Sequence, residues 1–167
     1  MISMVALAVV LALMLGELWL SLRNERTLLA RGAFAPPDPV YSSMRLAYPA
    51  VFVLMAVEGA LLPYASANFV AAGTAVFVLG KALKVWAIAT LGERWTYKVL
   101  ILPGAPLVTN GPYRFMRHPN YVGVVGELIG MALITGARVT GPLGVLFFSW
   151  LLLRRIRAED QALRGIY

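Results

Sequence analysis

Residues 1–22 read MISMVALAVVLALMLGELWLSL, and the only polar side chains in this stretch belong to Ser3, Glu17 and Ser21. A helix needs about 20 mostly apolar residues to cross a bilayer, so the stretch has the length of a membrane span. The charged sequence RNER follows it. A secretory signal peptide would have a basic segment before the apolar run and an Ala-x-Ala pattern near its end, and both are missing here. We therefore expect a retained membrane helix.

The composition of the whole chain is typical of a membrane protein. Of its 167 residues, 60% are hydrophobic and 14% are charged, whereas soluble domains have roughly 45–50% and about 25%. The net charge is +7, but the cations lie at the ends of apolar runs and form no basic stripe, so we expect no nucleic acid partner. With no cysteine and one histidine, we expect no metal site.

Four more apolar segments follow, at 45–64, 68–91, 121–136 and 140–153. The first two are separated by the uncharged turn LPYASAN. The last two are shorter and flank ARVTG, which favours a helical hairpin partly buried in protein. We expect an all-α integral membrane protein with five transmembrane helices in a single domain, 1–167. In it, 1–91 forms three N-terminal helices and 92–167 carries the functional site.

The cations predict the orientation of this bundle. They are concentrated in the 22–45 loop, the 92–120 segment and the tail after 153, while Arg138 lies on the opposite side of the five spans. Loops rich in Lys and Arg face the cytoplasm. We therefore expect an N-terminus outside, with the polar segment and the C-terminus in the cytoplasm.

The segment LPGAPLVTNGPYRFMRHPNY, 102–121, concentrates turn-forming pairs and contains the only histidine, His118. Irregular backbone at membrane depth is tolerated where it is buried in protein or lines a wet cavity, so this segment lies at the interface or walls a pocket. Pro119 suits the first position of the fourth helix. A helix-entry turn with interfacial anchors is the alternative, and a lone histidine by itself argues only weakly for catalysis.

Small and ionisable residues occur inside the apolar segments. Gly123, Gly126 and Gly130 share one helix face, which close helix packing explains. The ionisable residues there are expensive to bury and count as candidate functional groups: Glu17, Glu58, Lys81, Lys84 and Glu127. Lys84 is near enough to the cytoplasmic end to snorkel. For Lys81 and Glu127, a structural ion pair is at least as plausible as a substrate role.

Arg155 and Glu159 are four residues apart just beyond the last apolar segment, and therefore share a helix face. Such spacing is typical of a surface ion pair. The alternative is a split pair of ligand contacts, with Arg155 binding an anionic substrate and Glu159 an ammonium group.

Three elements in this order resemble the C-terminal signature of isoprenylcysteine carboxyl methyltransferases: Gly111-Pro112-Tyr113, Arg117-His118-Pro119-Asn120-Tyr121-x-Gly123, and Arg155-x-x-x-Glu159-x-x-x-Leu163. The similarity covers roughly 95–167 and is nearer to the short bacterial members, which implies a bacterial inner membrane. It implies S-adenosylmethionine as cofactor, and a lipophilic small molecule or prenylated acceptor reached through the lipid.

The resemblance also implies roles for individual residues. Those expected at the cofactor are Ala105, Pro106, Leu107, Val108, Tyr113, His118, Pro119, Asn120, Tyr121 and Glu159. Arg155 is expected to hold the acceptor, and His118 is the obvious base if the acceptor is not already anionic. Lys98 stands about where eukaryotic members have a polar amide. We expect methylation of an oxygen of a carboxylate or acidic enol.

Two other functions remain open at this level. Sterol and steroid reductases, which use NADPH, share part of the Arg-His-Pro-Asn-Tyr-x-Gly pattern, but an acidic residue commonly follows the glycine there, whereas Val124 follows it here. The other alternative is a non-catalytic membrane binding protein whose polar segment is an interfacial anchor.

Overall fold

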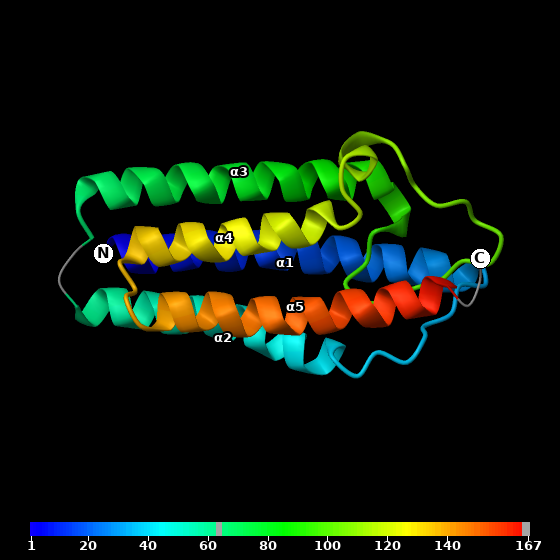
Figure 1. Cartoon of the computed structure of the whole chain (residues 1–167), viewed down its shortest axis with the longest axis horizontal. Coiled ribbons are helices and arrows are strands. Elements are labelled where there is room, and N and C mark those ends of the chain that lie inside the picture. Colours follow the sequence, from blue (N-terminus) through cyan, green and yellow to red (C-terminus); the bar gives the residue numbers. More distant parts are fainter. Residues whose placement is uncertain (63–64, 165–167) are drawn as a thin grey trace.

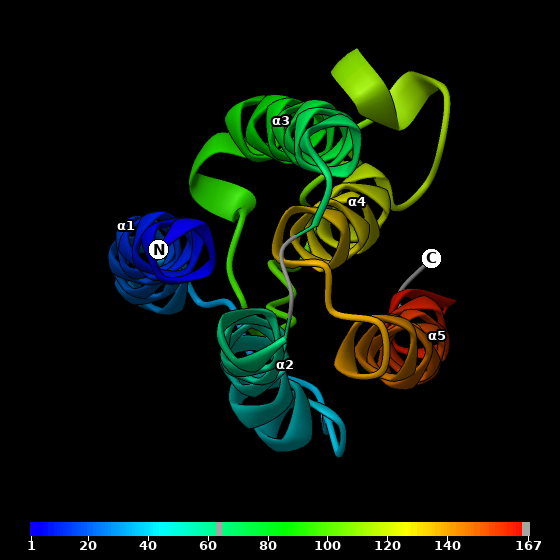
Figure 2. The same cartoon turned by 90° about the vertical axis from the view of Figure 1, so that its left-hand side faces the viewer.

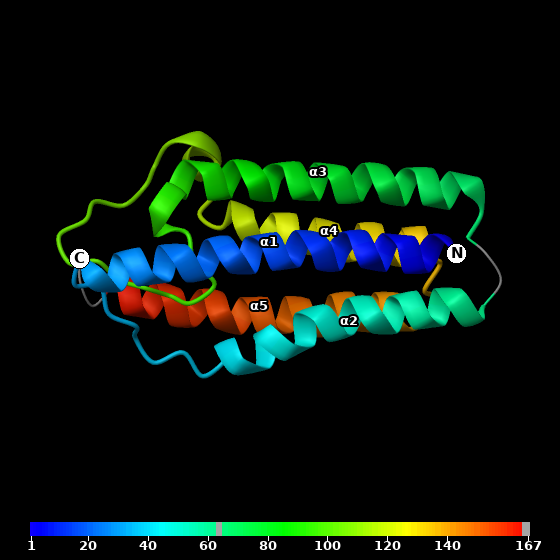
Figure 3. The same cartoon turned by 180° about the vertical axis from the view of Figure 1, so that it is seen from behind.

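The computed structural model describes residues 1–62 and 65–164, with Leu163 and Arg164 described as backbone only. This part of the chain folds into five α-helices: α1 (Ile2–Ala30), α2 (Tyr41–Leu61), α3 (Ala67–Leu91), α4 (Pro119–Thr135) and α5 (Thr140–Arg164). Two 3-10 turns, η1 (Gly92–Arg94) and η2 (Gly111–Arg114), lie between α3 and α4. The helices run alternately in opposite directions (Figures 1 and 3). The predicted all-α fold is confirmed. Within the predicted turn LPYASAN, Pro63 and Tyr64 lie outside the described residues.

The middle of the bundle is occupied by α4, which contacts each of the other four helices (Figure 2). Its Leu128 and Met131 are fully buried, beside Phe52 and Met55 of α2 and Phe148 of α5. Helices α1, α2 and α3 are long and apolar enough to cross a membrane, whereas α4 is a shorter apolar helix. The chain therefore has the build of an integral membrane protein, with α4 buried among the other helices as its short apolar run predicts.

Glycines allow α3 and α4 to pack at close range. A Cβ on Gly123 would lie 2.7 Å from the carbonyl oxygen of Gly80, and one on Gly130 would lie 2.6 Å from Phe77. Real Cβ atoms do not approach backbone so closely, so the backbones can meet only where side chains are missing. The glycine face of α4 is a packing face, as its spacing predicts.

Two helices extend well past their apolar runs. We expected spans ending at Leu22 and Leu153, but α1 continues to Ala30 and α5 to Arg164. No glycine or proline interrupts either extension, and most of the residues are good helix formers. In α1 the extension is also held in place, because the Asn24 amide donates to the carbonyl oxygens of Gly92 and Trp95 at 3.1 and 2.8 Å.

The two ends of the bundle differ in what they carry. The 31–40 connection, residues 92–118 and the last turns of α5 meet at one end, on the right in Figure 1. At the other end, Glu58 accepts hydrogen bonds from the backbone N–H groups of Arg138, Val139 and Thr140 at 2.8, 2.9 and 2.7 Å. A carboxylate at a helix N-terminus is favourable, so Glu58 joins α2 to the α4–α5 hairpin.

Four ionisable side chains meet inside the bundle, and we call them the buried charge cluster: Glu17, Lys81, Lys84 and Glu127. Lys81 lies 2.8 Å from both Glu17 and Glu127, which confirms the predicted Lys81–Glu127 pair. Lys84 does not snorkel. Its side chain is 1% exposed, and its ammonium lies 2.6 Å from Glu17 Oε2 and 3.5 Å from Glu127 Oε2, because it sits on the face of α3 that packs on α4.

Candidate active site

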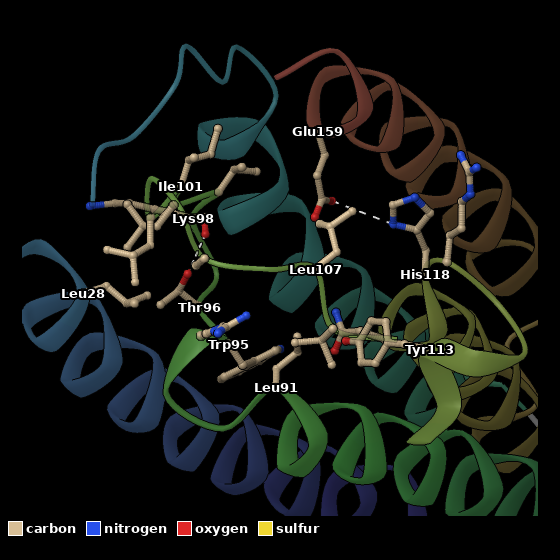
Figure 4. A pocket seen from close by; sticks show the side chains of 18 of the residues that line it. Leu28, Leu91, Trp95, Thr96, Lys98, Ile101, Leu107, Tyr113, His118 and Glu159 are labelled. Carbon is tan, nitrogen blue, oxygen red and sulfur yellow. Dashed lines mark hydrogen bonds and ion pairs between the residues drawn. The ribbon is translucent and has the colours of Figure 1, made fainter. Parts of the chain in front are cut away.

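A cavity of about 780 Å³ opens at the end of the bundle where the irregular segments meet, between the ends of α1, α3, α4 and α5 and residues 94–109 (Figure 4). Sites for small ligands and cofactors occupy about 300–1,000 Å³. The cavity is therefore large enough for a cofactor or a similar ligand.

The wall formed by residues 94–109 is fixed by contacts with its surroundings. The Arg94 guanidinium donates to the carbonyl oxygen of Pro106 at 2.6 Å, and this hydrogen bond joins the start of the segment to its later part. Phe34 and Ile101 exchange two backbone hydrogen bonds of 3.0 and 2.9 Å, so the 31–40 connection is paired with this wall. Gly111 has φ +56°, and a Cβ there would lie 2.5 Å from Thr90 Oγ1. Glycine is thus required for the turn that leads into η2.

His118, Tyr121 and Glu159 form one group at the cavity. The Tyr121 hydroxyl donates to Glu159 Oε2 at 2.8 Å, and His118 Nδ1 lies 3.9 Å from the same oxygen. The rings of His118 and Tyr121 are stacked with centroids 5.5 Å apart. Figure 4 shows His118, at the start of α4, and Glu159, from α5, pointing toward each other. His118 Nε2 lies 3.4 Å from Asp160 Oδ1, so two carboxylates face the imidazole.

Tyr113 lines the same cavity from η2. Burial, and next the negative charge of Glu159, raise the pKa of the Tyr113 hydroxyl above its usual value. The hydroxyl therefore stays protonated at physiological pH and remains able to donate a hydrogen bond.

Arg155 is buried, with 4% of the residue exposed. Its Nη1 lies 2.6 Å from Asp38 Oδ2, and its Nη2 donates to the carbonyl oxygen of Tyr97 at 2.5 Å. The guanidinium also lies over the Tyr41 ring, 5.6 Å from the centroid. Arg155 is therefore not half of a surface ion pair with Glu159, the arrangement that is typical of the spacing. The two residues face the cavity with different partners.

The structure brings together all but one of the residues predicted from sequence. The cavity is lined by Ala105, Pro106, Leu107, Val108, Tyr113, His118, Asn120, Tyr121, Arg155 and Glu159. Pro119 is fully buried in the first turn of α4 and does not belong to this lining. It begins the helix, as predicted, while its contact with a cofactor stays a prediction. The side chain of Leu163 lies outside the described residues.

Other residues of the site were not predicted. Leu28, Leu91, Trp95, Thr96 and Asp160 line the cavity, and Asp38 binds Arg155 from the 31–40 connection. The polar sequence WTYK, which follows the 68–91 apolar run after the residues GER, was a usable signal for the 95–98 part of the lining. For Asp38 and Leu28 the sequence carries no such signal, because their contacts depend on how α1 and α2 return to the site.

Lys98, which also lines the cavity, is directed to α1. Its ammonium forms an ion pair with Glu25, and the hydrogen bond to that carboxylate raises the pKa of Lys98. The ion pair therefore joins the wall formed by residues 94–109 to α1.

A sequence model of the isoprenylcysteine carboxyl methyltransferase (ICMT) family matches residues 72–165, more than half of the chain's 167 residues. The chain belongs to this family. The match starts within α3 and includes the whole polar segment and all of α5, so it takes in most of the lining of the cavity. It leaves out α1, α2 and the 31–40 connection.

Individual relatives include an uncharacterized bacterial protein and two named methyltransferases. An uncharacterized protein of Bacillus subtilis, YpbQ, is 31% identical over 95% of this chain and 94% of its own length. Protein-S-isoprenylcysteine O-methyltransferase B of Arabidopsis thaliana is 30% identical over 57% of this chain and 49% of its own. Phosphatidylethanolamine N-methyltransferase B of Dictyostelium discoideum is 32% identical over 64% and 54%. No solved structure gives a significant match. The family and these methyltransferases support a membrane methyltransferase.

Proposed function

We propose that the protein is an S-adenosylmethionine-dependent methyltransferase that methylates an oxygen, of a carboxylate or acidic enol, on a lipophilic acceptor. The observation that carries the proposal is the single cavity in which the segment 105–121 meets Arg155 and Glu159 of α5. These two parts of the chain are distant in sequence, and α5 contributes one cation and one carboxylate to the cavity. The methyltransferase relatives named above support the same chemistry, and they favour it over a reductase or a non-catalytic binding protein.

The polar groups of the cavity fit this cofactor. Asn120 Oδ1 and Arg155 Nε are buried and have no hydrogen-bond partner among the described residues, although buried polar atoms normally have one. Glu159 and Asp160 add carboxylates that suit an ammonium group. The residues that would hold the cofactor are Ala105 to Val108, Tyr113, Asn120, Tyr121 and Glu159.

S-adenosylmethionine supplies a methyl group bound to a sulfonium, which needs positioning more than acid–base help. The protein's task is to align the acceptor oxygen and exclude water, which can lower a barrier by roughly 7–11 kcal/mol. Arg155 is placed to hold the acceptor oxygen. For an acceptor that arrives with its proton, His118 is the group that accepts it.

The membrane arrangement is part of the proposal. A single domain spans a bacterial inner membrane with five helices, its N-terminus outside and its C-terminus cytoplasmic, because the described cations gather at the cavity end. The soluble cofactor enters from the cytoplasm, and a lipophilic small molecule or prenylated acceptor enters from the lipid.

Calorimetry on the protein purified in detergent tests cofactor binding. We expect S-adenosylhomocysteine to bind, and E159Q to weaken its binding about tenfold, because a hydrogen bond or ion pair to a charged group contributes roughly 1.5–3 kcal/mol. E93Q is the matched control, since Glu93 pairs with Arg31 on the surface with 51% of its side chain exposed. Binding of NADPH in place of S-adenosylhomocysteine would contradict the proposal and favour a reductase.

Mass spectrometry identifies the acceptor. A bacterial lipid extract is incubated with the protein and S-adenosylmethionine carrying an isotope-labelled methyl group, and the labelled lipids are fragmented. We expect the label on an oxygen. Label on a nitrogen would support a methyltransferase but contradict methylation of an oxygen. This outcome has to be tested because one relative, from Dictyostelium, is named as an N-methyltransferase.

A further inference from the structure

Asp38 uses its two carboxylate oxygens for different purposes. Oδ1 accepts hydrogen bonds from the backbone N–H groups of Val40 and Tyr41, at 3.2 and 3.1 Å, where α2 begins. Oδ2 forms the ion pair with Arg155 Nη1 at 2.6 Å, and 12% of the Asp38 side chain is exposed. One oxygen thus shapes the start of α2 while the other fixes a residue of the cavity.

The pair leaves Arg155 in a defined pose. Nη1 is held by Asp38, Nη2 by the Tyr97 carbonyl, and the guanidinium plane lies over Tyr41. Arg155 lines the cavity, whereas Asp38 does not belong to the lining. Nε remains without a hydrogen-bond partner in the part of the chain that the structure describes. The partners of Nη1 and Nη2 thus fix the guanidinium beside the cavity, with one donor still unused.

Charge compensation explains why an acid is needed behind Arg155. A guanidinium that is 4% exposed is costly without a counter-charge, and a buried charge left alone is displaced or finds another partner. In this site the nearest competing partners would be the carboxylates of Glu159 and Asp160, which line the same cavity.

The 31–40 connection is attached to the cavity at a second point. Phe34 and Ile101 pair through two backbone hydrogen bonds, and Ile101 belongs to the lining. Phe34 therefore holds the 31–40 connection on the wall formed by residues 94–109, and Asp38 holds it on α5. It lies outside residues 72–165, the part of the chain that matches the ICMT family.

From these contacts we infer that Asp38 is a positioning residue of the methyl-transfer site, which holds the Arg155 guanidinium at the cavity so that its positive charge serves the acceptor oxygen. The inference rests on the proposed function. It assigns part of the acceptor site to the connection between α1 and α2, and it makes Asp38 act through Arg155 without touching the acceptor.

Two substitutions separate this role from capping of α2. D38N keeps an oxygen that can accept from Val40 and Tyr41 but removes the charge. D38E keeps the charge but moves the carboxylate one methylene away from the helix start. The assay measures transfer of isotope-labelled methyl from S-adenosylmethionine into a bacterial lipid extract, at increasing amounts of extract. Calorimetry with S-adenosylhomocysteine runs in parallel, with E93Q as the control.

For D38N we expect the half-saturating amount of extract to rise, or the maximal rate to fall, about tenfold, as for a lost bond to a charged group. The affinity for S-adenosylhomocysteine should stay close to wild type, while the melting temperature should fall, because the buried Arg155 loses its counter-charge. D38E should retain most of the transfer. In an R155M background, which removes the contact, D38N should cause little further loss, because residues that act through one contact are non-additive.

Each contrary result overturns the inference. If D38N transfers like wild type while D38E fails, Asp38 only caps α2. If D38N lowers the half-saturating amount, Asp38 competes with the acceptor for Arg155. Additive losses in the R155M background would show that the two residues act independently. If wild-type protein neither binds S-adenosylhomocysteine nor transfers label, the proposed function fails and the inference with it. Transfer by wild type alongside an unaffected D38N would remove the inference alone.

Discussion

Glu159 is held in place at the cavity by an aromatic residue of α4. The Tyr121 hydroxyl donates to its Oε2, and the Tyr121 ring stacks on His118. Because the hydroxyl fixes one carboxylate oxygen, the other remains for a ligand. Tyr121 therefore influences a bound cofactor through Glu159 as well as through any contact of its own.

Substituting Tyr121 by phenylalanine tests this dependence. Y121F keeps the stacked ring but removes the donor to a charged acceptor, which contributes roughly 1.5–3 kcal/mol. We expect the Kd for S-adenosylhomocysteine, measured by calorimetry, to rise about tenfold with little change in melting temperature. An unchanged Kd would show that Glu159 does not depend on this hydrogen bond.

The polar segment and the Arg155/Glu159 pair could be predicted because their chemistry is local in the sequence. Turn residues, one histidine and a four-residue spacing all lie within short stretches. Asp38 could not be predicted in this way. Its importance comes from a contact between the 31–40 connection and α5, and nothing in the surrounding sequence APPDPV distinguishes it from an ordinary helix-capping aspartate.

At the scale of helices, the buried charge cluster links α1, α3 and α4. Its two lysines and two glutamates balance in charge, and the Tyr48 and Tyr97 hydroxyls donate to Glu127 and Glu17, at 2.5 and 2.9 Å. The sequence indicated the Lys81–Glu127 pair of this cluster, but not that Glu17 of α1 pairs with both lysines. Hydropathy places an ionisable residue at membrane depth, but the rotation of each helix decides which residues meet.

Removing one member of the cluster should destabilise the protein more than removing a balanced pair. K84M leaves two carboxylates with one lysine, and breaking a buried pair costs about 3–5 kcal/mol. K84M/E17Q leaves Lys81 with Glu127, which are 2.8 Å apart, so the double variant should be more stable than K84M alone.

Denaturation in mixed micelles measures these differences in the free energy of unfolding. E93Q is the control, because Glu93 pairs with Arg31 and 51% and 54% of their side chains are exposed, and surface pairs contribute about 0–1 kcal/mol. A K84M/E17Q variant destabilised by the sum of its two single substitutions would contradict coupling within the cluster.

At the scale of the molecule, helix number and direction followed from the apolar runs. The shared helix face of Arg155 and Glu159 also indicated that α5 continues past its run, whereas the length of α1 was not predicted. An apolar run reports the part of a helix that suits the bilayer, and α1 and α5 continue beyond it without a breaking residue. The consequence is functional. Leu28 of α1 and Arg155 and Glu159 of α5 lie on these extensions and line the cavity, so the site is built on helix ends that project past the apolar core.

The orientation of the bundle predicts which end reagents reach from outside the cell. The chain has no cysteine, so single cysteines can be introduced without a background. Val139, between α4 and α5, is 59% exposed, and Glu93, at the cavity end, has a side chain 51% exposed.

With a cytoplasmic cavity, a membrane-impermeant maleimide should label V139C in intact cells, and E93C only after the membrane is permeabilised. The reverse pattern would place the cavity outside, away from the cytoplasmic pool of S-adenosylmethionine, and would contradict the orientation. Labelling of both positions from one side would contradict their placement at opposite ends of membrane-spanning helices.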